Sequence, residues 1–263
     1  MLYQGVLKKM LTENTNPIQY YLNLKEDFIH LNQKINQDVS LKFMKYQCKN
    51  CNQNKKIYRQ GFCFSCFGET PKAGEWIMHP EKSKAHLNEE DRDLAYEKEV
   101  QLKPHIVYLA NSSNVKVGVT RKTQVPTRWI DQGAHEALIL LETPNRYIAG
   151  IAEVALKQYV ADKTNWRKML KNQIEDKNLE EVKTALIQYL PEEVKEYIQN
   201  EQEKMTIVFP VEKHPTKPIS LNLEKNPTYK GKLVGIKGQY LIFDNNRVFN
   251  VRNHEGFYVE INI

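Results

Sequence analysis

The chain has four cysteines, and their spacing is its most specific chemical signal. They form the pattern C-x2-C-x11-C-x2-C at Cys48, Cys51, Cys63 and Cys66. Two such pairs make two sharp knuckles that can bring four thiolates onto one tetrahedral zinc ion. The alternatives are four unrelated buried thiols or two disulfides, and we favour zinc because residues 1–24 lack a secretory signal pattern. Since the protein supplies all four ligands, the predicted zinc is structural rather than catalytic.

A second group of residues has types suited to phosphate chemistry. Hydrolysis of a phosphodiester needs a base for water, a cation for the developing charge and a divalent metal near the leaving oxygen. Tyr108 is a candidate base, provided that Lys116 lowers the pKa of its phenol. Arg128 is a candidate phosphate clamp, Glu153 a candidate ligand for Mg²⁺ or Mn²⁺, and Asn165 completes the ordered set. Each also has a structural interpretation, because tyrosines often pack in cores and lysines and glutamates are mostly solvated.

Five predicted elements must position these side chains. The runs "HIVYLA" and "VKVGVT", residues 105–110 and 115–120, are rich in β-formers, and "NSSN" between them favours a tight hairpin. A helix is predicted at about 124–132, and "EALILLET", residues 136–143, predicts a third strand. A second helix should lie on this sheet through one apolar face, formed by Ile148, Ile151, Ala152, Ala155, Leu156 and Tyr159.

The ordered set "IVYLA", "VKVG", Arg128, Glu153 and Asn165 resembles the GIY-YIG nuclease superfamily over residues 105 to about 166. The resemblance implies a three-stranded sheet flanked by helices, a tyrosine facing the scissile phosphate, an arginine on a helix and a metal-binding glutamate. Ile106, Val107 and Tyr108 match the first motif of that family. In the second motif Lys116 stands where the family usually has its second tyrosine.

A longer resemblance covers nearly the whole chain. The segments "CFSCF", "RDLAYEKE", "PNRYIAGIAEV", "DKTNWRKML" and "GIKGQYLIF" are similar to an uncharacterised bacterial family called domain of unknown function 2797. That family implies a fold but no activity. Its members tend to have cysteine where this chain has Ser83, which raises the question of a metal role for His79 and His86; we expect both histidines to be surface or hydrogen-bonded residues.

The whole chain is predicted to be an α+β protein. Strands at 1–47 and 204–263 are expected to pair into one β-barrel-like module, because each set alone has too few strands to bury both faces. Between them we expect a zinc ribbon or knuckle at 48–67, a connector at 68–104, the nuclease-like domain at 105–170 and a helical segment at 171–203.

The net charge of +6 fits a DNA or RNA partner, although 32 acidic residues dilute the positive field. Arg121, Trp129 and Arg167 are candidate nucleic-acid contacts, but tryptophans that join a helix to a sheet are as common. No apolar window is long enough for a membrane span, so a cytoplasmic protein is expected. The predicted function is a metal-dependent nuclease. The alternatives are a non-catalytic nucleic-acid or ribonucleoprotein binder and a protein-interaction scaffold.

Overall fold

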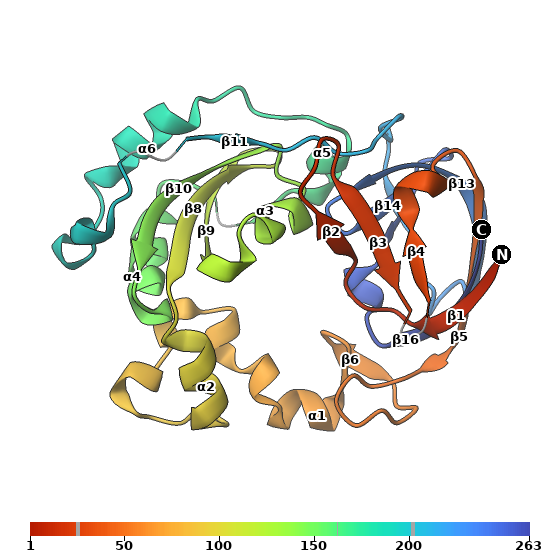
Figure 1. Ribbon diagram of the computed structural model, residues 1–263, viewed down its shortest axis with the longest axis horizontal. Coiled ribbons are helices and arrows are strands. Elements are labelled where there is room, and N and C mark those ends of the chain that lie inside the picture. Colours follow the sequence, from red (N-terminus) through yellow and green to blue (C-terminus); the bar gives the residue numbers. More distant parts are fainter. Residues whose placement is uncertain (25–26, 162, 201–202) are drawn as a thin grey trace. The chain divides into compact units, whose positions relative to one another are not determined.

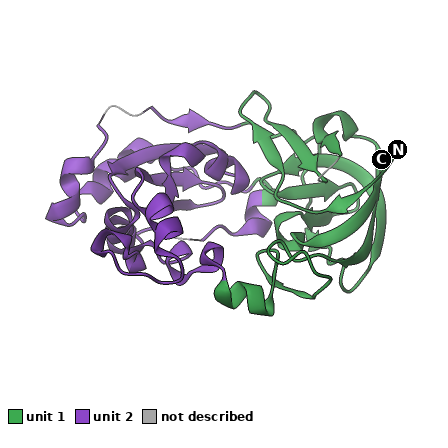
Figure 2. Ribbon diagram, turned by 60° about the horizontal axis from the view of Figure 1, so that its bottom comes forward, with its two compact units in different colours: residues 1–69, 170–172, 208–263 green, residues 70–169, 173–207 purple. Residues whose placement is uncertain are grey.

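The computed structural model describes residues 1–24, 27–161, 163–200 and 203–263 (Figure 1). The chain forms two compact units (Figure 2). Unit 1 comprises residues 1–69, 170–172 and 208–263, and unit 2 comprises residues 70–169 and 173–207. The mixture of several sheets with helices confirms the predicted α+β class. In the described ranges no helix is long and apolar enough to cross a membrane.

Unit 1 is built around a seven-stranded sheet that joins strands from both ends of the chain (Figure 1). Neighbouring strands are antiparallel, except for the parallel pair at one edge formed by β12 and β15. In spatial order the strands are β1 (Leu2–Val6), β16 (Phe257–Asn262), β5 (Asp38–Tyr46), β13 (Thr228–Lys237), β14 (Tyr240–Phe243), β15 (Arg247–Asn250) and β12 (Ile219–Ser220). A three-stranded antiparallel sheet in the same unit contains β2 (Leu11–Glu13), β3 (Gln19–Asn23) and β4 (Phe28–His30).

The cysteine segment folds as a short hairpin followed by a helix. Strands β6 (Ile57–Arg59) and β7 (Phe62–Cys63) are antiparallel, and helix α1 (Phe64–Glu69) follows directly. Both residues of the turn, Gln60 and Gly61, have positive φ, at 54° and 82°. This is the backbone that a two-residue hairpin turn needs to match the twist of its strands.

Unit 2 contains a four-stranded antiparallel sheet whose order is β11 (Met205–Thr206), β10 (Glu136–Thr143), β8 (His105–Asn111) and β9 (Val115–Arg121). All three strands predicted between residues 105 and 143 are present. Every residue of β8 is buried, because this central strand is covered on both faces. Its apolar side chains join those of β9, β10 and the helices in one core.

The helices are α2 (Leu94–Gln101), α3 (Thr127–Asp131), α4 (Arg146–Leu156), α5 (Trp166–Leu170) and α6 (Leu179–Ile187). Short 3-10 turns complete the chain, namely η1 (Leu31–Lys34), η2 (Pro71–Ala73), η3 (Glu75–Ile77), η4 (Pro80–Lys82), η5 (Ala85–Leu87), η6 (Lys122–Gln124), η7 (Glu192–Tyr197) and η8 (Arg252–His254). The helix predicted from about residue 124 begins only at Thr127. Val125 is extended before Pro126, as the residue before a proline generally is.

Helix α4 supplies most of the helical core of unit 2. Its N-terminus is capped by Asn145, whose side-chain oxygen accepts a hydrogen bond from the backbone N–H of Ile148 at 3.0 Å. Ala149, Ala152 and Leu156 are fully buried against the sheet. The predicted apolar face was wrong at its end, because the helix stops at Leu156 and Tyr159 is exposed.

Candidate functional site

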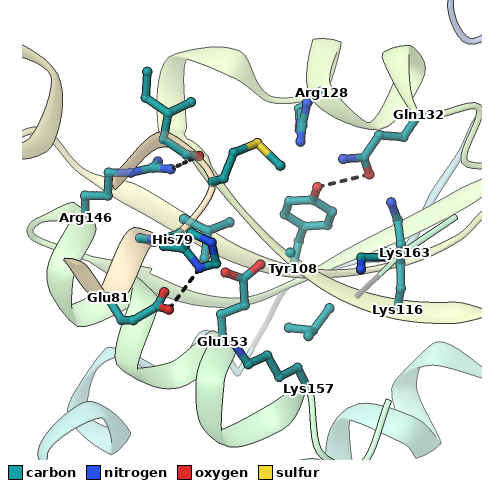
Figure 3. Close-up of a pocket in the computed structure, with 16 residues that line it drawn as sticks. His79, Glu81, Tyr108, Lys116, Arg128, Gln132, Arg146, Glu153, Lys157 and Lys163 are labelled. Atoms are coloured by element: carbon teal, nitrogen blue, oxygen red, sulfur yellow. Dashed lines mark hydrogen bonds and ion pairs between the residues drawn. The ribbon is translucent and has the colours of Figure 1, made fainter. Parts of the chain in front are cut away.

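Unit 2 contains a cavity of about 190 Å³ between its sheet, helices α3 and α4, and the segment 77–81 (Figure 3). The polar part of the lining carries five cationic side chains and two carboxylates. These polar residues are His79, Glu81, Tyr108, Lys116, Arg128, Gln132, Arg146, Glu153, Lys157 and Lys163. The surplus of cations makes the cavity suited to an anionic group such as a phosphate.

Tyr108 lies in this cavity because its partner on the neighbouring strand, Gly118, has no side chain. Tyr108 on β8 pairs directly with Gly118 on β9. A Cβ atom on Gly118 would lie only 2.7 Å from the phenol oxygen of Tyr108 and 2.8 Å from its ring carbon Cζ. The glycine of "VKVG" therefore leaves the space in which the tyrosine ring lies.

The hydroxyl of Tyr108 keeps its proton in the resting protein. It donates a hydrogen bond to Oε1 of Gln132 at 3.1 Å. Burial raises the pKa of Tyr108, and the nearby positive charge of Arg128 only partly opposes this effect. The expectation that Lys116 lowers the pKa of Tyr108 was wrong, because the protein raises that pKa and the opposing charge comes from Arg128.

Lys116 and Arg128 reach the cavity from different elements. Lys116 lies on β9 and is 4% exposed, although lysines on hairpins are usually solvated. Arg128 lies on α3, and Gln132, which follows the last residue of α3, lies beside the hydroxyl of Tyr108 (Figure 3). Sheet and helix thus place two cations and two hydrogen-bonding groups on the same cavity.

Glu153 points from α4 into the cavity and lies between His79 and Tyr108 in Figure 3. Burial raises the pKa of Glu153, while the positive charges of Arg146 and Lys157 oppose the rise. A buried carboxylate that favours its neutral form gains most from an additional cation. Carboxylate oxygens are ligands of the kind that Mg²⁺ and Mn²⁺ prefer.

The connector contributes cavity residues that the sequence analysis did not predict. His79 and Glu81 line the cavity, with 3.4 Å between Nδ1 of His79 and Oε1 of Glu81. Their backbone packs against α4 at Gly150, where a Cβ atom would lie 2.2 Å from the nitrogen of Glu81. The available signal was this glycine within the predicted helical face, since a glycine inside a helix often marks a close approach of another backbone.

Arg146 on α4 binds the backbone of the connector next to the cavity. Its guanidinium donates hydrogen bonds to the backbone oxygens of Trp76 at 3.1 Å and Ile77 at 2.8 Å. Burial lowers the pKa of Arg146 to about 10, so the side chain remains cationic at neutral pH. His86 of the same connector stacks on Tyr147, with ring centroids 4.4 Å apart, and it does not line the cavity.

Four other predicted residues lie outside the cavity lining. Asn165 is exposed, and its side-chain oxygen accepts a hydrogen bond from the backbone N–H of Lys168 at 3.2 Å in α5. Trp129 is 3% exposed, with its ring centroid 5.9 Å from that of Tyr108, so its ring is not open to a base. Arg121 ends β9, and the exposed Arg167 lies over the ring of Trp166 at 4.3 Å.

In unit 1 the four cysteines form one cluster whose sulfur atoms all lie within 4.8 Å of one another. Tetrahedral Zn–S bonds of about 2.3 Å imply sulfur separations of about 3.8 Å, so the cluster fits zinc. Burial opposes ionisation of Cys48, but backbone hydrogen bonds from Cys63, Cys51 and Asn50 outweigh it and lower the pKa of its thiol to about 6. The ionised thiolate is the form of cysteine that binds a metal.

The fold and the site define an α+β protein that has a four-cysteine cluster able to hold zinc and, in its second unit, a cavity whose charged lining residues are mainly cations. The chain belongs to the family described as "Protein of unknown function (DUF2797)", which matches residues 36–259. The matched region includes the cysteine cluster and every residue that lines the cavity. Comparisons with curated proteins and with solved structures gave no match.

Proposed function

We propose that the cavity of unit 2 hydrolyses phosphodiester bonds of DNA or RNA with the help of a divalent metal. One observation carries the proposal. Tyr108, Lys116, Arg128 and Glu153, chosen from their order along the chain, line one cavity although they come from two strands and two helices. Strands β8, β9 and β10 with helices α3 and α4 also have the order expected of a GIY-YIG domain, which supports the same function.

The cations of the cavity have a direct role in this proposal. Arg128, with its planar guanidinium, grips two phosphate oxygens, and Lys116 adds a charge at a water-poor position where it acts strongly. Glu153 would hold Mg²⁺ or Mn²⁺, which supplies charge stabilisation at the oxygen that leaves. As charge develops on the phosphoryl oxygens, the fixed cations stabilise it without rearranging.

The proton of the attacking water needs an acceptor other than Tyr108, because that phenol holds its own proton. His79 lines the same cavity, and an imidazole accepts protons near neutral pH. We assign His79 the role of the base, and we assign Tyr108 the role of a hydrogen-bond donor to phosphate, its single proton turning from Gln132 to the bound phosphate. The oxygen of water then forms the new P–O bond while its proton passes to His79. The bond to the leaving oxygen breaks with its electron pair on that oxygen, which takes up a proton from solvent to give the alcohol.

A non-catalytic nucleic-acid binder on the same fold is the second candidate function. Lys116 occupies the position of the second tyrosine of the GIY-YIG motifs, and burial raises the pKa of Tyr108. Both features favour a cavity that binds phosphate without cleaving it. In both cases we propose that the four cysteines hold one structural zinc ion.

The test is incubation of zinc-loaded protein with labelled DNA and RNA, in Mg²⁺, in Mn²⁺ and without added metal. Metal-dependent cleavage that Glu153→Ala abolishes supports the nuclease. The matched control is Glu181→Ala on the exposed side of α6, which removes one carboxylate away from the cavity and should leave cleavage unchanged. Binding whose affinity falls with added salt and that leaves every strand intact would support the second candidate instead.

A further inference from the structure

Strand β6 and helix α1 lie close together in unit 1 (Figure 1), and their side chains form a cluster of exposed aromatic rings. We call Tyr58, Arg59, Phe64 and Phe67 the aromatic patch. The ring of Tyr58 lies edge-on to Phe64 and to Phe67, with centroids 5.3 Å apart in both pairs. Phe64 is 74% exposed and Tyr58 is 49% exposed. Adjacent exposed aromatic rings that form one patch, unlike single exposed rings, mark an interaction surface.

Positive charge lies directly beside these rings. The guanidinium of Arg59 is 5.3 Å from the ring centroid of Tyr58. Lys55 and Lys56 precede β6 and are exposed, and Lys56 makes an ion pair with Glu224 at 2.7 Å. An exposed ion pair of this kind is weak and exchanges readily for a phosphate. Rings with adjacent cations are the combination that binds bases by stacking and their backbone by charge.

Other exposed aromatic residues of the described chain lack this combination. Phe28 stacks on Tyr21, whose hydroxyl donates a hydrogen bond to the carboxylate of Glu13 at 3.1 Å, so negative charge lies beside that stack. Tyr159 and Tyr189 stack on each other with centroids 3.7 Å apart, which covers one face of each ring. The aromatic patch is therefore the best base-stacking surface among these groups.

We propose that the aromatic patch binds single-stranded nucleic acid by stacking bases on Phe64 and Tyr58 while Arg59 and Lys55 contact the phosphates. This second site goes beyond the cavity of unit 2. Single strands are favoured over duplexes because paired bases are stacked on each other and present no free face to the rings. Trp129, whose ring is buried, cannot serve in this way.

The test is the affinity of the full chain, zinc-loaded and carrying Glu153→Ala to prevent cleavage, for fluorescent single-stranded oligonucleotides of DNA and of RNA. Phe64→Ala and Tyr58→Ala should each raise the dissociation constant about 5- to 150-fold, the effect of losing one stacked base. Phe28→Ala is the matched control, since it removes another exposed ring, 57% exposed, and should leave the affinity unchanged. Arg59→Gln should reduce the salt dependence of log K by about 0.7.

Zinc content and circular dichroism of each variant show whether the cysteine hairpin is still folded. Unchanged affinity in folded Phe64→Ala and Tyr58→Ala proteins, or equal binding of duplex and single strand, would overturn the proposal. This outcome is distinct from failure of the proposed nuclease, because cleavage is measured separately with Glu153 intact. Cleavage by that chain together with unchanged affinity in the patch variants refutes only the patch, whereas patch-dependent binding without cleavage by that chain refutes only the nuclease.

Discussion

The substitution Gly150→Ala measures how closely the connector is packed on helix α4. An alanine in a helix interior is favoured over glycine by about 0.8–1.0 kcal/mol, so propensity alone predicts a more stable protein. The new Cβ atom, however, would lie 2.2 Å from the nitrogen of Glu81 and 2.5 Å from the carbonyl carbon of Pro80. Overpacking costs about 1–3 kcal/mol, and a clash with backbone atoms lies in the upper part of that range.

We therefore expect Gly150→Ala to destabilise the protein by about 1–2 kcal/mol net, which lowers Tm by roughly 2–8 °C. Cleavage should fall as well, because the displaced segment carries His79 and Glu81. Gly68→Ala in α1 is the control, since a Cβ atom there meets no atom within 4 Å and should stabilise by about 0.5–1 kcal/mol. Thermal and urea unfolding give both values. If Gly150→Ala were as stabilising as Gly68→Ala, the connector would not be packed on α4 as described.

Three further predictions concern charge and metal. Because burial raises the pKa of Glu153, its ionised form destabilises the native state at neutral pH. Glu153→Gln should therefore raise Tm at pH 7. This gain in Tm should vanish at a pH low enough to protonate the carboxyl in both the folded and the unfolded state. Burial lowers the pKa of Lys237 from 10.5 to about 8, so stability should increase as pH rises through this window, and Lys237→Met should abolish the increase in pH-dependent unfolding curves. Elemental analysis should find one zinc ion per chain. The Cys48→Ser variant should lose this ion, and the control variant Ser65→Ala should keep it. Equal zinc content in the two variants would exclude the four-cysteine site.

Local patterns were sufficient to predict the cysteine cluster and three of the four strands in the sheet of unit 2, whereas the fourth, β11, was expected in the module of N- and C-terminal strands. Continuous apolar runs at 105–110 and 136–143 are typical of buried strands, and the cysteine spacing fixes which four sulfur atoms can meet. The pairing of strands from the two ends of the chain followed from each set being too small alone. These features depend on neighbours in sequence or on simple strand number.

The rest depended on contacts that no local pattern encodes. Glu81 lies in the short 3-10 turn η4 and His79 directly precedes it, without hydrophobic periodicity, and the packing of this turn on Gly150 brings both to the cavity. The pKa of Tyr108 is set by how deeply its ring is buried, which depends on the packing of α3 over the sheet. Asn165 has a residue type suited both to catalysis and to capping a helix, and its contact with Lys168 shows the capping role.

The most direct test of a catalytic cavity is the position of Mn²⁺ in crystals of the protein grown with a phosphorothioate oligonucleotide that resists cleavage. Anomalous scattering locates this ion without assumptions about its ligands. The proposed function predicts an anomalous peak beside the carboxylate of Glu153, at about 2.0–2.2 Å, with a phosphate oxygen as a further ligand. Absence of a peak at Glu153 in crystals that contain the oligonucleotide in the cavity would contradict metal-dependent hydrolysis at this site.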